Sequence, residues 1–155
     1  SVMFCISKGL GAPVGSVLCG RADFLARAKQ ARMWCGGAMR QSGVIAAAGI
    51  VGLKDYPDRF AADHANARRL AEGLSRLPLF EIDMRSVQTN MVYVRVVNPG
   101  FDPARFERHC YERGLWVRAN KERFRFVLHH QVSSAHVDKA VEVIEQFTRA
   151  ALPPL

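Results

Sequence analysis

No apolar run in this sequence approaches the roughly 18 residues that a membrane-spanning helix requires. No basic region precedes the first apolar run, so the pattern typical of a secretory signal peptide is missing as well. The sequence also contains no internal repeat and no low-complexity segment. Without an apolar run of that length or a signal peptide, we expect no membrane partner and a cytoplasmic location.

Cysteine is scarce, and the four cysteines form no Cys-x-x-Cys pair: they are Cys5, Cys19, Cys35 and Cys110. Three of them lie in apolar sequence surroundings. The pattern predicts buried free thiols of a reducing compartment rather than disulfides or a zinc site, and no metal is expected.

Acidic residues are outnumbered: 22 Lys and Arg against 14 Asp and Glu give a net charge of +8. The densest basic region, residues 105–125, is interleaved with Glu107, Glu112 and Glu122, and no nucleic-acid-binding motif accompanies it. A solvated mixed-charge face explains this region better than a nucleic-acid partner. At 155 residues and 49% hydrophobic content, the chain is long enough to bury a core as one domain or a small pair.

The first third of the chain predicts strands at residues 2–6 and 17–19, an amphipathic helix at 21–34 and a buried, Ala-rich helix at 40–54. Two strands and two helices are too few to close a sheet, so we expect further sequence on the N-terminal side.

The remainder predicts an α/β layer. Helices are expected at residues 58–77, after Pro57 at the first turn, and from Asp102 and Pro103 to Gly114, with a last helix capped by Ser134. Strands are expected at residues 91–97, 115–118 and 124–128.

One lysine stands out, in the motif SKGLGAPVGS at residues 7–16. Lys8 follows an apolar strand, and a lysine held at the end of a buried strand is a good nucleophile toward carbonyl groups. The motif is neither a Walker loop nor a dinucleotide fingerprint. The alternative is a solvated hairpin corner.

This motif and GGAMRQSGVIAAAG at residues 36–49 resemble low-specificity L-threonine aldolases. Shorter matches are QTNMV at residues 88–92 and RFVLH at 125–129. That family, the aromatic amino acid beta-eliminating lyase/threonine aldolase family, belongs to the aspartate-aminotransferase-like (fold type I) enzymes that use pyridoxal 5'-phosphate. The resemblance implies that residues 1–57 form the C-terminal piece of the large cofactor-binding domain. Residues 58–155 would form a small C-terminal α+β domain.

The resemblance also implies the roles of four residues. Lys8 would carry pyridoxal phosphate through a Schiff base, and Arg40 would lie near the cofactor phosphate at a subunit interface. Arg125 would hold the substrate carboxylate, supported by His129. The substrate would be a β-hydroxy amino acid, L-threonine or L-allo-threonine, cleaved to glycine and acetaldehyde in a full-length homo-oligomer, a dimer or tetramer.

Other interpretations stay open at this point. Arg125 could be an ordinary surface residue of a strand, and Arg40 could cap the adjacent glycine turn. His129 and His130 could have a structural role. The family's phosphate loop, ring-stacking residue and pyridinium-pairing aspartate precede the lysine, so we expect this chain alone to bind the cofactor poorly. The chain could instead belong to another fold type I lyase acting on β-substituted amino acids, or be an inactive fragment or accessory subunit.

Overall fold

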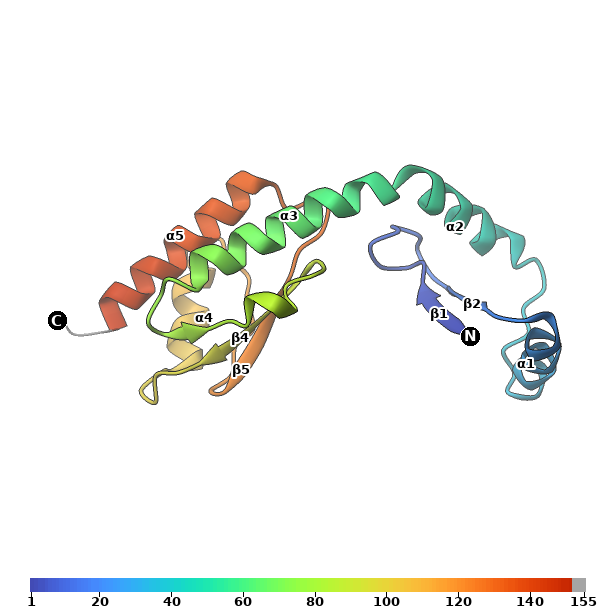
Figure 1. The fold of residues 1–155 in the computed structure, drawn as a ribbon, viewed down its shortest axis with the longest axis horizontal. Helices are drawn as coiled ribbons and strands as arrows, with labels where there is room; N and C mark the ends of the chain where they lie inside the picture. The colour runs from blue at the N-terminus through green and yellow to red at the C-terminus, as the bar shows by residue number, and fades with distance from the viewer. Residues whose placement is uncertain (152–155) are drawn as a thin grey trace. The chain divides into compact units, whose positions relative to one another are not determined.

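The computed structural model describes residues 1–151, which separate into two compact units (Figure 1). The first unit is Ser1–Asp58, and the second begins at Arg59. Each unit is described by itself below.

The first unit contains a two-stranded antiparallel sheet and two helices. Strand β1 (Val2–Cys5) pairs with β2 (Ser16–Cys19), and Val2 lies opposite Cys19. Helix α1 (Ala22–Trp34) and helix α2 (Gly43–Asp55) follow. These four elements confirm the predicted order, although α2 begins three residues later than expected.

The prediction that α2 is buried is wrong. Only Gly49 and Gly52 of this helix are buried, and Ile45 is half-buried. Its other large apolar side chains are exposed: Val44, Ile50, Val51 and Leu53. A helix that is apolar on all sides is normally covered on all sides. Among the described residues, only its glycine face is covered.

The second unit is an antiparallel sheet with packed helices (Figure 1). The strands are β3 (Phe80–Glu81), β4 (Met91–Val96) and β5 (Arg123–Val127), in the order β3-β4-β5. The helices are α3 (Pro57–Leu74), α4 (Pro103–Tyr111), α5 (Ser134–Ala151) and the short 3-10 helix η1 (Met84–Ser86). Neither β3 nor η1 was predicted.

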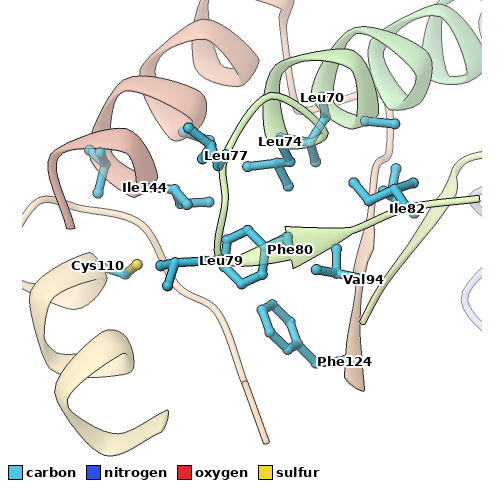
Figure 2. Packing of buried hydrophobic residues seen from close by; sticks show 14 of the residues in the cluster. Leu70, Leu74, Leu77, Leu79, Phe80, Ile82, Val94, Cys110, Phe124 and Ile144 are labelled. Carbon is cyan, nitrogen blue, oxygen red and sulfur yellow. The ribbon is translucent and has the colours of Figure 1, made fainter. Parts of the chain in front are cut away.

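One hydrophobic cluster forms the core of this unit (Figure 2). In β4, Val92 and Val94 are fully buried while Tyr93 and Arg95 are exposed, which confirms the predicted alternation. The predicted inner face of α3 is also confirmed, since its buried residues include Ala67, Leu70, Ala71 and Leu74. Helix α5 contributes Val137, Ile144 and Phe147, and α4 contributes Phe106 and Cys110.

Helix starts follow the sequence more closely than helix ends, since α3 ends at Leu74 and not at residue 77, and α4 ends at Tyr111, before Gly114. The Asp102 carboxylate accepts hydrogen bonds from the backbone N–H groups of Ala104 and Arg105, as expected of an N-cap. The cap of α5 is one residue earlier than predicted: the Ser133 hydroxyl, not that of Ser134, accepts from the His136 N–H.

The predicted strand at residues 115–118 does not form. The Leu115 N–H donates to the Cys110 carbonyl at 2.9 Å, and the Ala119 N–H donates to the Glu107 carboxylate at 2.8 Å. Both ends of the segment are therefore held to α4, not paired with β5.

The prediction of buried thiols holds only in part. Cys110 is fully buried and Cys5 half-buried, whereas Cys19 and Cys35 are exposed. All four are free thiols. Over residues 1–151, no helix combines the length and apolar character needed to cross a bilayer.

Candidate functional site

Lys8 lies in the tight loop that joins β1 to β2. Its carbonyl accepts a hydrogen bond from the Gly11 N–H at 2.8 Å, and the Ile6 carbonyl accepts from the Ala12 N–H at 3.0 Å. Ile6 also donates its N–H to the Gly15 carbonyl. Gly11 and Gly15 have φ of 74° and 119°, values that favour glycine. The glycines of the motif therefore shape the loop that presents Lys8.

Helix α2 fixes this loop through its two buried glycines. A side chain at Gly52 would collide with the backbone carbonyl of Leu10, and one at Gly49 would press on the Ile6 side chain. The helix backbone thus lies directly against the loop, which only glycine permits. Sequence analysis missed this function of Gly49 and Gly52; the signal was a pair of glycines three residues apart on one face of a predicted helix.

The Lys8 side chain is exposed, so the predicted desolvation by a buried strand end is wrong for this chain. Ile6 and Leu10 on either side are buried, but nothing in the described part of the chain covers the lysine side chain. Within residues 1–151 the Lys8 amine makes no hydrogen bond or ion pair. It is a primary amine on a backbone-fixed loop, free to react with an aldehyde, and so fits the attachment of pyridoxal phosphate.

Arg40 lies in the same unit, in the turn between α1 and α2, and is exposed. The next residue, Gln41, has a positive φ of 52°. Arg40 therefore leads into the helix that supports the Lys8 loop, but no interaction joins the two side chains among the described residues. A role for Arg40 toward a phosphate stays a prediction.

Arg125 is central on β5, in the second unit, and is paired in register with Tyr93 of β4. Both side chains are on the exposed face of the sheet, while their neighbours Phe124 and Val92 are buried. Within the described chain the guanidinium has no ion pair. A planar donor without an internal partner is suited to a carboxylate ligand.

His129 follows β5 and is also exposed. Asn90 fixes this end of the strand through two hydrogen bonds to Leu128. The side-chain amide of Asn90 donates to the Leu128 carbonyl at 2.6 Å, and the backbone carbonyl of Asn90 accepts from the Leu128 N–H at 2.8 Å. Asn90 therefore anchors the residue immediately before His129. The rings of His129 and His130 are 6.2 Å apart.

Arg125 and His129 line the same groove, which has a volume of about 470 Å³. The structure thus brings two of the four predicted site residues together. Lys8 and Arg40 belong to the first unit, and Arg125 and His129 to the second. The groove also contains His136 and Lys139 from α5, which sequence analysis missed because nothing in a single helix marks them as site residues.

Comparison with known proteins gives a direct family match. Residues 1–97 match the family model described as beta-eliminating lyase. The chain belongs to the beta-eliminating lyase family. The predicted family is therefore confirmed.

Similar proteins agree. The chain is 37% identical over 148 residues to low-specificity L-threonine aldolase 1 of Arabidopsis thaliana, covering 94% of this chain and 41% of that protein. It is 48% identical over 96 residues to the low specificity L-threonine aldolase of Escherichia coli K12, covering 62% and 28%. The chain therefore spans less than half the length of these relatives.

A solved structure described as a putative L-allo-threonine aldolase, from Listeria monocytogenes EGD-E, superposes with a TM-score of 0.74 at 19% identity. The match covers 97% of this chain and 44% of that one. This likeness confirms the predicted mixed α/β fold of the fold type I class, of which this chain covers one part. The predicted division into domains and the roles of the four site residues are not tested by it.

Proposed function

We propose that this chain is part of a pyridoxal-phosphate-dependent lyase of the threonine aldolase type. The reaction is the cleavage of L-threonine or L-allo-threonine to glycine and acetaldehyde. The observation that carries the proposal is the Lys8 loop, whose backbone is fixed against Gly49 and Gly52 and whose amine is unengaged within residues 1–151. The names of the relatives support the reaction type.

Lys8 would hold the cofactor by a covalent bond from its Nζ to the aldehyde carbon, and would release it when a substrate amine takes its place. When bound, pyridoxal phosphate supplies an electron sink for the bond that breaks at Cα. Arg40 would contribute positive charge toward the phosphate.

Arg125 would bind the substrate carboxylate through two parallel N–H donors. A bidentate grip orients the amino acid, and so selects which bond at Cα is cleaved. In the retro-aldol direction a base would take the proton of the β-hydroxyl, the Cα–Cβ bond would break to release acetaldehyde, and Cα would take up a proton to give glycine. His129, which follows the Leu128 backbone that Asn90 anchors, would help to hold the carboxylate of the substrate.

The same proposal includes a cytoplasmic location and a homo-oligomeric full-length enzyme. Because the chain spans 41% of the Arabidopsis relative, we expect the isolated chain to bind pyridoxal phosphate weakly and to show little aldolase activity. Lysine alone provides only a reversible bond, while most affinity for such a cofactor comes from contacts to its phosphate and ring.

The test is borohydride trapping. The chain is incubated with pyridoxal phosphate and reduced, and the modified peptides are mapped by mass spectrometry. We expect one dominant adduct, at Lys8, that disappears in Lys8→Ala, while the control Lys29→Ala on α1 keeps it. Adducts spread evenly over surface lysines would contradict the assignment of Lys8.

A second candidate is a fold type I lyase that eliminates a β-substituent, favoured by the description of the matched family. A substrate panel separates the two: release of acetaldehyde from β-hydroxy amino acids supports the aldolase, and release of pyruvate from β-substituted ones supports elimination.

A further inference from the structure

Strand β5 is an edge strand whose outer side is open. In the ladder with β4, the Leu128 N–H donates to the Asn90 carbonyl, and the Val96 N–H donates to the Glu122 carbonyl. Because hydrogen-bonded positions alternate in an antiparallel pair, the N–H and C=O groups of Arg123, Arg125 and Val127 point away from β4. The Arg123 N–H donates to the side-chain oxygen of Asn120 at 2.7 Å. Within residues 1–151, no backbone hydrogen bond joins the outward groups of Arg125 and Val127 to another element.

The 470 Å³ groove lies beside this open edge. Its apolar lining includes Leu115 and Val117, both half-buried, and Leu128 and Val137, both buried. Its charged or titratable lining is entirely basic: Arg113, Arg118, Arg125, His129, His136 and Lys139. No aspartate or glutamate lines it. The groove therefore has an apolar floor and a positive rim.

Three of the basic groups have acidic neighbours outside the lining. Arg113 lies 3.8 Å from Glu112, Arg118 lies 3.6 Å from Glu107, and Lys139 lies 3.0 Å from Glu142. All three pairs involve exposed cations, so each contributes little and yields readily to a ligand.

Two of the remaining basic groups, Arg125 and His136, are better placed to donate. Arg125 has no ion pair within the described chain. The Nδ1 atom of His136 accepts the Ser133 N–H at 3.3 Å, so the ring carries its proton on Nε2 and offers a donor even when neutral.

We propose that the groove binds an extended, negatively charged peptide segment, which pairs with β5 as an additional strand. A peptide backbone satisfies both the N–H and the C=O groups along the edge, whereas a small anion would satisfy only the donors. Acidic side chains complement the basic rim and the net charge of +8, and alternate apolar side chains fit the floor. The proposal requires neither the cofactor nor Lys8.

The experiment reads binding directly, because Arg125 also has a role in the proposed function. The ¹⁵N-labelled chain is titrated with the peptide acetyl-Val-Glu-Val-Glu-Val-Glu-amide, without pyridoxal phosphate. We expect saturable shifts of the Arg125 and Val127 amides, larger than those of the Val92 and Val94 amides of β4. Arg125→Gln should weaken binding about tenfold. The matched control Arg123→Gln should change it less than about twofold, since Arg123 is on the same strand but outside the groove lining.

Two further peptides isolate the mechanism. A lysine-for-glutamate version should not bind. A version N-methylated at alternate residues keeps its charge but loses the strand pairing, and it should bind at least tenfold more weakly. Lys139→Gln, on α5, is a second variant that removes a positive charge from the groove, and it should also weaken binding of the acidic peptide. Circular dichroism checks that this variant is folded.

Equal affinity of the methylated peptide would overturn the proposal, as would tighter binding of an oligothymidylate at the same amides. Protection of the Arg125 and Val127 amides in the free chain would also overturn it, because the edge would then already be paired.

Discussion

The two units of this chain differ in how much of their apolar surface they bury themselves. Among the described residues, the buried apolar side chains of the first unit are Ile6, Leu10 and Ala12. The second unit buries one continuous cluster that includes one face each of α3, α4 and α5 and the inner face of a sheet. The second unit thus has the core of an independent domain, whereas the first has the Lys8 loop, supported mainly by one helix.

The two units also differ in how their aromatic side chains pack. In the second unit, Phe106 contacts Phe80, Phe101, Phe124 and Phe147, with ring centroids 5.1–6.1 Å apart. In the first unit, Trp34 is 77% exposed and contributes to no core. The environment of the exposed Lys8 side chain therefore depends on whatever covers the first unit.

Thiol labelling should show the largest difference between the units. Burial raises the pKa of the Cys110 thiol to about 12, so at pH 8 it is both inaccessible and protonated. Cys19 and Cys35 are exposed. With iodoacetamide at pH 8, we expect Cys110 to react on the order of a thousandfold more slowly than these two, as read by peptide mass spectrometry. Similar rates would show that the second unit lacks a stable core.

Core truncation should be the next largest effect. Leu74→Ala removes a fully buried side chain and should lower the free energy of unfolding by about 2–5 kcal/mol. The matched control Leu53→Ala alters a leucine of α2 that is 49% exposed and should change it by less than about 0.5 kcal/mol. Urea unfolding followed by circular dichroism measures both. An equal loss in the two variants would contradict the contrast between the units.

Sequence patterns predicted those parts of the structure whose partners lie in the same chain. The faces of α3 and α5 and the alternation of β4 follow from periodicity, since the groups that cover them are within the second unit. The burial of α2 could not be predicted, because it depends on what lies against the helix and not on its own composition.

Residues 115–118 show a second reason why a sequence-based prediction fails. Their alternation is real: Leu115 and Val117 pack against the core, while Trp116 and Arg118 are exposed. Hydrogen bonds that the segment donates to α4 at both ends hold it away from the pairing that the alternation suggested. For the candidate site, the motifs identified the residues, but no pattern showed that Arg125 and His129 share a groove with His136.

A change at the Lys8 support should have an intermediate effect. Gly52→Ala places a methyl group against the Leu10 carbonyl and should cost about 1–3 kcal/mol of local stability. The measurement is hydrogen exchange at the Gly11 and Ala12 amides, whose acceptors are the Lys8 and Ile6 carbonyls. Gly43→Ala, in open space on the same helix, should leave this exchange unchanged. Unaltered exchange in Gly52→Ala would show that α2 does not support the loop.

The smallest effect is expected at the α4 cap. Asp102→Ala removes the acceptor of the Ala104 and Arg105 amides and should cost about 1 kcal/mol, while Asp102→Asn should retain most of the stability. Thermal unfolding of the second unit measures the change in stability. Equal losses for alanine and asparagine would rule out the cap as the cause.

The most direct test of the contrast between the units is native-state hydrogen exchange of the whole chain, read by mass spectrometry. We predict slow exchange, close to global unfolding, for the buried positions of β4, α3 and α5, and fast exchange through local opening for β1, β2 and α2. Uniform slow exchange across both units would contradict the account, because the first unit would then be stable on its few buried side chains alone.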